Sequence, residues 1–254
     1  VPAWRGVDLP AWMRGPLLAV ILLLAAGLRF TGLNWDEGQW IHPDEGHMRM
    51  ITAAIHWPAA PALYFDAERS PLNSFNQGQA YSYGTLPLFA TRLVAEGLDR
   101  GCGETPNRLA AAAAGLIAPG AMPCPPGLFT TSLSAVVGRA LSALADLGTV
   151  WLAYLIGRRL YGDRAGLLAG LLAALTAFAI QQAHFYTVDS LAGFFTVLAV
   201  YYAVRAAYPG GPVPHATEGS GDPPGAALAM AGLAVGLATA CKLSAAPAAL
   251  FVAL

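Results

Sequence analysis

Residues 138–170 read GRALSALADLGTVWLAYLIGRRLYGDRAGLLAG, two apolar segments joined by a short basic turn. A helix needs about 20 mostly apolar residues to cross the hydrocarbon core of a bilayer. The apolar segments around this turn extend over residues 133–157 and 165–183 and meet or approach that length. The turn contains Arg158, Arg159 and Arg164, and short arginine-rich loops stay on the cytoplasmic side of a membrane. The stretch therefore predicts a helical hairpin that crosses the membrane twice and has its turn in the cytoplasm.

Three further segments have the composition of membrane spans. They are residues 16–33, 188–206 and 226–241, and another apolar run begins near Ala245. Arg5 and Arg14 precede the first segment, which taken alone also fits a signal peptide, although the later segments span regardless. We predict an all-α fold, a polytopic transmembrane helical bundle, in which residues 34–131 form a long non-cytoplasmic loop bearing interfacial helices.

Composition supports a membrane protein and excludes a nucleic-acid-binding one. Hydrophobic residues make up 56% of the chain and charged residues 11%, against roughly 25% charged residues in a typical soluble domain. The net charge of -1 gives no basic excess for binding a phosphate backbone. Membrane lipids are therefore the expected surroundings, and we expect an integral, multi-pass protein of the cell membrane with its site on the non-cytoplasmic face.

The two ends of the sequence and one internal segment bear on its organisation. The chain starts at Val1 without methionine and stops at Leu254 inside an apolar run. We therefore expect residues 1–254 to be a single, incomplete transmembrane catalytic module, the N-terminal part of a longer protein. Residues 208–225 are rich in proline and glycine and are predicted to form a cytoplasmic linker.

The three cysteines, Cys102, Cys124 and Cys241, have no zinc-ligand spacing, and an odd number gives no complete disulfide framework. Unpaired thiols are the favoured interpretation. A bond between Cys102 and Cys124 stays open as the alternative if their loop faces an oxidising compartment.

Two segments of the long loop are predicted to be interfacial helices. Residues 81–98 contain Arg92, Glu96 and Pro87, and they must not cross the membrane if the basic turn is cytoplasmic. Residues 44–57 place apolar side chains on one helical face: Met48, Ile51 and Ile55. Tryptophans in the same loop suit the headgroup zone of a membrane: Trp35, Trp40 and Trp57.

Polar groups from three distant parts of the chain reach one membrane face in this topology. The acidic residues Asp36, Glu37, Asp44 and Glu45 follow the first span. His184, Tyr186 and Asp189 lie where the third and fourth spans meet outside, and Lys242 ends the fifth. This convergence predicts a site, although Lys242 snorkelling to headgroups and Asp189 capping a helix are the plainer alternatives.

Two further sets of side chains have alternative interpretations. Arg139 and Asp146 lie seven residues apart on one face of the second span. A structural contact between helices is favoured for Asp146, whereas the guanidinium of Arg139 suits a phosphate. His42 and His47 bracket Asp44 and Glu45, which allows a divalent metal site in principle but does not require one. No cofactor is otherwise indicated.

The sequence resembles the membrane glycosyltransferases of the GT-C superfamily, in particular the family 39 relatives of protein O-mannosyltransferases and of the bacterial aminoarabinose transferase. Four features occur in the family's order: LNWDEGQWIHPDEGHMRM after the first span, the hairpin quoted above, HFYTVDSLAGFF with Asp189, and GLAVGLATACKLSAAP with Lys242. The chain departs from relatives that carry an arginine soon after the Asp-Glu pair, because Gly46 and His47 stand there.

The resemblance implies a reaction and roles for these residues. The donor would be a polyprenyl-phosphate-linked sugar, transferred with inversion on the non-cytoplasmic face. Asp44 would take the proton of the acceptor hydroxyl, while Glu45 and Asp189 would hold hydroxyls or tune the charge on Asp44. Lys242 would bind the departing phosphate, with Arg139 and Arg69 behind it. The long loop would close over the donor and exclude water.

Other functions are compatible with a polytopic chain. A transporter places ionisable groups near the bilayer midplane, often at broken helices, and a non-enzymatic assembly subunit needs no site. A lipid-linked oligosaccharide ligase or polymerase would use a similar donor but transfer a glycan. The sequence leaves the sugar and the acceptor open, whether protein, lipid or glycan.

Overall fold

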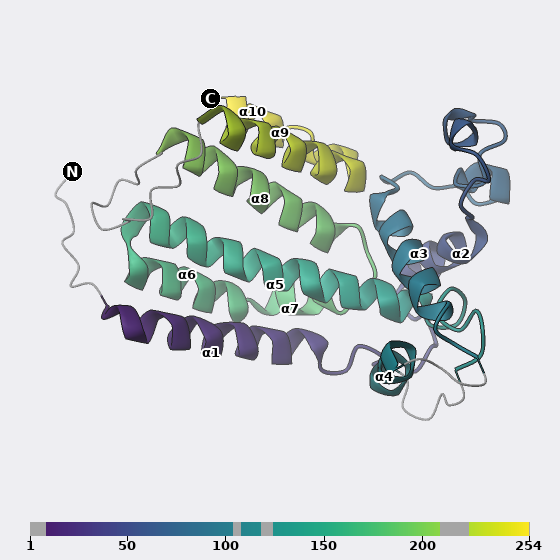
Figure 1. Ribbon diagram of the computed structural model, residues 1–254, viewed down its shortest axis with the longest axis horizontal. Helices are drawn as coiled ribbons and strands as arrows, with labels where there is room; N and C mark the ends of the chain where they lie inside the picture. The colour runs from purple at the N-terminus through teal and green to yellow at the C-terminus, as the bar shows by residue number, and fades with distance from the viewer. Residues whose placement is uncertain (1–8, 104–107, 118–123, 209–223, 254) are drawn as a thin grey trace. The chain divides into compact units, whose positions relative to one another are not determined.

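The structure is a computed structural model that describes residues 9–103, 108–117, 124–208 and 224–253. Within these residues all regular elements are helices, as predicted, and Figure 1 shows their arrangement. The linker predicted at residues 208–225 lies almost entirely outside the described residues.

The chain divides into two compact units. The first, which we call the span unit, consists of residues 1–31, 143–183 and 189–254. The second, the loop unit, consists of residues 32–142 and 184–188. The expected long loop, residues 34–131, falls inside the loop unit, which also takes in the start of the next helix and a short segment before Asp189.

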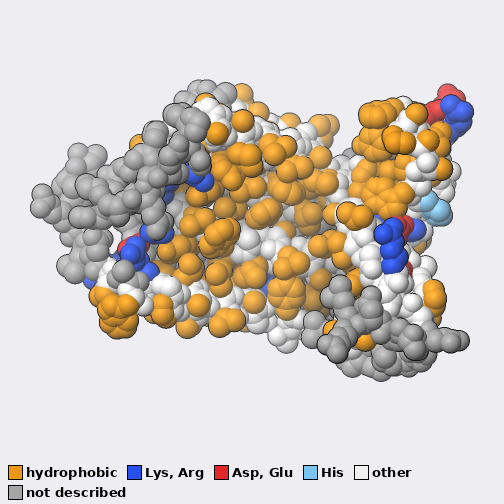
Figure 2. Space-filling model, viewed as in Figure 1, with side chains coloured by type: hydrophobic (Ala, Val, Ile, Leu, Met, Phe, Trp, Pro, Cys, Tyr) orange, Lys and Arg blue, Asp and Glu red, His pale blue; other side chains and the backbone are white. Residues whose placement is uncertain are grey.

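The span unit contains the helices that are long and apolar enough to cross a membrane. Three of these are α1 (Ala11–Phe30), α5 (Ser134–Tyr161) and α8 (Asp189–Ala207), and α5 starts within the loop unit. Two shorter apolar helices are α9 (Pro224–Cys241) and α10 (Ala248–Ala253). Hydrophobic side chains cover the helices of this unit in Figure 2, as expected of surfaces that face lipid. The protein is an integral membrane protein.

The predicted span at residues 165–183 is broken rather than continuous. It consists of α6 (Asp163–Ala174) and α7 (Ala177–Ala183), which meet at a bend of 58°. The bend exposes carbonyls at the end of α6, and buried Arg29 of α1 donates to two of them, Ala174 at 2.9 Å and Ala173 at 3.2 Å. The bend could not be predicted from the sequence, because neither glycine nor proline stands between the two helices.

Close packing joins the hairpin of α5 and α6. A Cβ added at Gly166 would lie 2.8 Å from the Tyr154 carbonyl oxygen, so this position has no room for a larger residue. Arg158 donates to Asp163 at 3.0 Å across the turn. The apolar contacts of α1, α5 and α6 gather around buried side chains: Ile21, Ala25, Val150, Tyr154, Leu167 and Ala174.

The loop unit is built from α2 (Pro43–Ala54), α3 (Leu86–Asp99) and α4 (Arg108–Ile117). Two short 3-10 helices, η1 (Pro61–Phe65) and η2 (Ser74–Gln77), lie between α2 and α3. The third 3-10 helix of the described chain, η3 (Leu243–Ala245), belongs to the span unit. The apolar core of the loop unit is formed by Met48, Ile51, Ile55, Leu72, Tyr81, Leu88, Ala135, Tyr186 and Val188.

This core corrects one prediction and agrees with another. Met48, Ile51 and Ile55 are at most 2% exposed, so the apolar face of α2 packs against protein and not against lipid. The residues that cover this face come from segments distant in the sequence: Ala135, Tyr186 and Val188. Hydrophobic periodicity does not reveal such long-range contacts. Of the helix predicted at residues 81–98, only the part from Leu86 is helical, as α3, and α3 is not among the helices long and apolar enough to cross a membrane.

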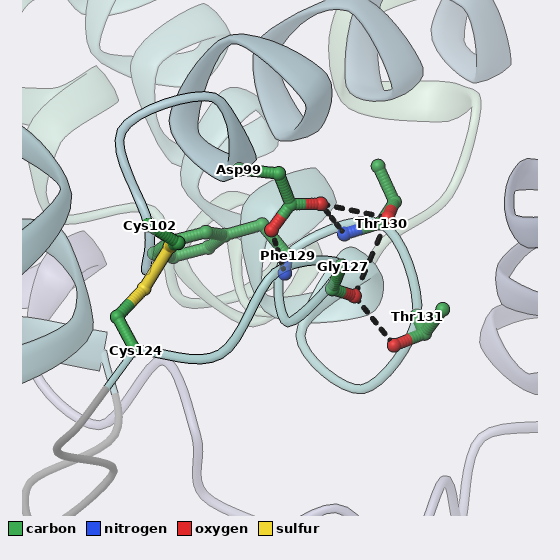
Figure 3. The surroundings of a disulfide bond; sticks show 7 residues. All are labelled: Asp99, Cys102, Cys124, Gly127, Phe129, Thr130 and Thr131. Carbon is green, nitrogen blue, oxygen red and sulfur yellow. Dashed lines mark hydrogen bonds between the residues drawn. A yellow bond between two sulfur atoms is a disulfide. The ribbon is translucent and has the colours of Figure 1, made fainter. Parts of the chain in front are cut away.

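The expectation of unpaired thiols was wrong for two of the three cysteines. Cys102 and Cys124 form a disulfide in the loop unit, and Cys241 is free and buried. Asp99 stabilises the segment that follows Cys124, because its carboxylate accepts hydrogen bonds from the backbone N–H groups of Phe129 (2.8 Å) and Thr130 (2.9 Å) (Figure 3). The spacing of cysteines cannot reveal such a bond, because the pairing depends on how α3 and the turn before α5 meet.

Candidate active site

The loop unit contains a fully buried arginine that is held by two carboxylates. The Nε of Arg139 donates to Glu45 at 2.7 Å, and Nη2 donates to Glu45 and to Asp36 at 2.8 Å each. Nη1 donates to Asp36 at 3.0 Å and to the carbonyl of Leu33 at 2.9 Å. A guanidinium has five N–H donors, so every donor of Arg139 has an acceptor. We call Arg139, Asp36 and Glu45 the ion network.

Asp36 also organises the turn that follows the first span. Its carboxylate accepts the backbone N–H groups of Gly38 at 3.3 Å and Trp40 at 3.1 Å. The backbone of Glu37 and of Trp40 adopts positive φ, 51° and 52°, which side chains disfavour unless other contacts hold it. Burial alone would raise the pKa of Asp36, but the hydrogen bonds and charge of Arg139 and the two N–H groups bring this pKa below its ordinary value.

Glu45 joins α2 to the segment that precedes α8. It lies in the first turn of α2, where a carboxylate is favoured by the helix dipole. Its Oε1 accepts the backbone N–H of Tyr186 at 2.7 Å, and the Tyr186 hydroxyl is 2.8 Å from that of Thr52. Burial raises the pKa of Tyr186 to about 12. Gly138 is required beside it, because a Cβ there would overlap the Tyr186 ring.

Two tryptophan rings lie close to the ion network. The guanidinium carbon of Arg139 is 5.1 Å from the ring centroid of Trp35 and 5.9 Å from that of Trp40. Arg49 lies over Trp40 at 4.9 Å. Phe185 contacts both Trp35 and His42, at centroid distances of 5.9 and 4.5 Å. Trp35 and Trp40, which the sequence predicts at the headgroup zone, thus each lie close to a guanidinium group of the protein.

The four acidic residues after the first span divide into two kinds. Asp36 and Glu45 are buried and fully engaged with Arg139. Asp44 and Glu37 are exposed. Asp44 directly precedes Glu45 in the first turn of α2, so a solvent-accessible carboxylate stands next to one that is fixed in place.

The span unit brings together two more of the predicted site residues. Asp189 is the first residue of α8, and its carboxylate accepts a hydrogen bond from Lys242 Nζ at 2.7 Å. Lys242, the only lysine of the sequence, follows α9 directly. Their side chains are 43% and 35% exposed, so the pair is accessible to a ligand.

The remaining predicted residues have other surroundings. Arg69 is 77% exposed and pairs with Asp66, three residues before it. Asp146 pairs with Arg29 of α1, which confirms the structural contact favoured for it. His47 lies 2.6 Å from the carbonyl oxygen of Ala80. In the part of the chain that the structure describes, no three His, Cys, Asp or Glu side chains are grouped to hold a metal ion.

Residues 128–254, which make up half of the chain, match the model of the dolichyl-phosphate-mannose-protein mannosyltransferase family. The chain belongs to this family. It is therefore a membrane glycosyltransferase of the GT-C kind, and the family implies a lipid-linked sugar donor. No curated protein and no solved structure matches the chain.

The family match covers one side of the ion network. Arg139, Asp189 and Lys242 lie within the matched residues, whereas Asp36, Asp44 and Glu45 precede them. The hydrogen bonds of Arg139 therefore connect the matched part of this mannosyltransferase-family chain to the loop that carries its acidic residues.

The sequence analysis assigns no role to two arginines that make specific contacts in the structure. Arg29 falls within an apolar span and pairs with Asp146, and an arginine inside a membrane segment usually indicates a buried partner. Arg49 received no role, and its position over Trp40 has no signature in the spacing of residues.

Proposed function

We propose that the protein transfers a sugar from a polyprenyl-phosphate donor to an acceptor hydroxyl on the non-cytoplasmic face, with inversion at the anomeric carbon. Membership of the mannosyltransferase family supports the donor class. The Cys102–Cys124 disulfide supports the face, because disulfides persist in oxidising compartments. Arg158 and Arg159 at the other end of α5 suit the cytoplasmic side.

The observation that carries the mechanism is the contrast between Asp44 and Glu45. Asp44 is exposed, whereas the carboxylate of Glu45 is held by Arg139 and by the Tyr186 N–H group. A general base must reach the proton that it removes, and only the exposed carboxylate can do so. We assign the base to Asp44 and a positioning role to Glu45, which fixes the first turn of α2.

The reaction then proceeds in one displacement. Asp44 takes the proton of the acceptor hydroxyl while the oxygen attacks the anomeric carbon. The bond between that carbon and the phosphate oxygen breaks, and the polyprenyl phosphate leaves with the bonding electrons. A cation near the departing phosphate stabilises the transition state more than the ground state.

Lys242 is the cation that we assign to the departing phosphate. Its side chain is partly exposed, and Asp189 orients it through a 2.7 Å hydrogen bond. Arg139 has no free donor, so it would have to break a bond to a buried carboxylate before binding phosphate. We therefore assign Arg139 to positioning. Arg69 is exposed and remains a secondary candidate for contact with the donor.

The test is transfer of radiolabelled sugar from a panel of polyprenyl-phosphate donors in membranes that carry the full-length protein. Asp44→Asn should reduce transfer by about 10²- to 10⁴-fold at equal membrane insertion. Glu37→Gln is the matched control, since Glu37 is also exposed in the same acidic cluster. Wild-type turnover by Asp44→Asn would remove Asp44 from the mechanism. Lys242→Ala should lose transfer as well.

One observation favours a carrier as the second candidate. Transporters commonly use helices that are broken within the membrane, and α6 and α7 form such a break. The carbonyls at this break already accept hydrogen bonds from Arg29, which leaves less capacity for a substrate ion. Failure of the wild type to transfer or hydrolyse any donor, with folding verified, would favour the carrier or an assembly subunit. Transfer of a preassembled glycan would instead indicate a ligase.

A further inference from the structure

The C-terminal ends of α5 and α8 lie side by side in the span unit (Figure 1). A Cβ added at Gly148 of α5 would lie 2.6 Å from the Phe194 ring of α8, so the two helices are in close contact there. Towards the ends, Arg159 of α5 donates a hydrogen bond to the carbonyl oxygen of Tyr208, which directly follows α8. The two contacts occur in the same order along both helices, so the helices run parallel. The negative ends of two helix dipoles therefore meet at one place.

Two arginines from different helices meet at this end. Arg159 and Arg205 lie in the last turns of α5 and α8, and both are half-buried. Their guanidinium groups are close enough for the two positive charges to repel each other. The Arg205 guanidinium carbon is 5.6 Å from the ring centroids of both Tyr201 and Tyr202, within the range of a cation–π contact. An anion placed between the two arginines would be attracted by both and would offset their repulsion.

This end of the span unit has an excess of positive charge. Three carboxylates occur among the described residues of the unit, and each pairs with other cations. The pairs are Asp146 with Arg29, Asp189 with Lys242, and Asp163 with both Arg14 and Arg158. Exposed Arg164 adds a further positive charge next to Asp163. The charge at the ends of α5 and α8 is therefore complementary to that of an anionic ligand.

The surroundings favour a lipid as the source of the anion. Arg159 and Arg205 stand at the ends of two helices that are long and apolar enough to cross a membrane. Tyrosines border the same ends, as is typical of the headgroup zone: Tyr161, Tyr201, Tyr202 and Tyr208. Tyr161 and Tyr208 are exposed, so they can contact a lipid that lies beside the helices. Basic pockets between membrane helices are known to bind anionic headgroups.

We propose that Arg159 and Arg205 bind the phosphate of an anionic phospholipid between the ends of α5 and α8. A guanidinium has five N–H donors, so Arg159 can hold the Tyr208 carbonyl and a phosphate oxygen at the same time. The lipid is not consumed by transfer, and its site uses neither Asp44 nor Lys242. The proposal is therefore independent of the proposed transfer reaction, and either can fail without the other.

The experiment is native mass spectrometry of the full-length protein in detergent, titrated with phosphatidylglycerol, with phosphatidylcholine of the same acyl chains as reference. A cation beside an anionic lipid surface contributes about 1 kcal/mol. Arg159→Gln and Arg205→Gln should therefore each weaken binding of the first phosphatidylglycerol roughly fivefold, and neither should change binding of phosphatidylcholine. Arg164→Gln is the matched control, since it removes an exposed arginine close to the same helix ends. It should bind as the wild type does.

Several outcomes would overturn the proposal. Equal weakening in all three variants would show a diffuse attraction to the basic turn and not a site. Wild-type affinity in both Arg159→Gln and Arg205→Gln, or a wild type that binds the two lipids alike, would refute it directly. Glycerol phosphate without acyl chains should not displace the lipid, and displacement at equal concentration would refute the assignment to a lipid.

A further variant covers the case in which a glutamine variant is not monodisperse. Arg205→Lys keeps the positive charge but loses the paired N–H donors that fit a phosphate. Its affinity for phosphatidylglycerol should still fall below that of the wild type. Unchanged affinity in this variant would count against the proposal.

Discussion

Replacing Arg139 by methionine tests whether the ion network holds the loop unit together. The change leaves Asp36 and Glu45 without their cation, and both carboxylates have 0% exposed side chains. Removing one partner of a buried ion pair costs about 3–5 kcal/mol. A domain of 150–250 residues loses roughly 2–4 °C in Tm per kcal/mol. The expected fall in Tm is therefore about 6–20 °C.

The assay heats purified protein in detergent and follows the monodisperse fraction by size-exclusion chromatography. The triple variant Arg139→Met, Asp36→Asn, Glu45→Gln removes all three charges and should recover part of the lost stability, because neutral groups avoid the cost of burying unpaired charge. Arg69→Met, at an exposed arginine, should match the wild type. A fall of less than about 3 °C in Arg139→Met would refute the reasoning.

Three further predictions address other features. Reduction or Cys102→Ser should destabilise the loop unit by about 3 kcal/mol, as expected for a bond that closes a loop of this size; unchanged gel mobility of the wild type on reduction would contradict the bond. Arg29→Met should lower Tm by several degrees, since it leaves Asp146 and two α6 carbonyls without their donor; insertion and Tm equal to those of the wild type would count against it. The pKa of Asp36 is lower in the folded protein than in the unfolded chain. Its ionised carboxylate therefore contributes fully to the stability of the fold above about pH 4, and this contribution is lost as the pH falls towards the pKa of the folded state. Melting between pH 3 and 6 should show this loss in the wild type and less of it in Asp36→Asn.

The membrane helices could be predicted from sequence because span length and hydropathy are local properties. Residues 133–157 and 188–206 correspond to α5 and α8 within a few residues. The break in residues 165–183 could not be predicted, because the groups that stabilise it come from α1. The disulfide likewise could not be predicted, because it depends on how the end of α3 meets the turn before α5.

The candidate site was predictable in residue type and not in detail. The sequence singled out Asp44, Glu45 and Arg139, but adjacent residues on a helix point about 100° apart, so only one carboxylate of the pair can face Arg139. Which one does so depends on a partner 94 residues away. The roles of Asp44, Asp189 and Lys242 stay predictions until transfer is measured.

Arg29 imposes an order on how the protein is made. It emerges from the ribosome 117 residues before Asp146 and 145 residues before Ala174. At about 5–20 residues per second, the first helix waits roughly 6–29 s for the partners of its guanidinium. Arg29 lies in the last turn of α1, so its insertion costs less than the about 2.5–3.5 kcal/mol that insertion scales give for an arginine at mid-bilayer. During biogenesis, the leucine-rich run ahead of Arg29 must therefore keep the first helix in the membrane unaided until α5 and α6 have been translated.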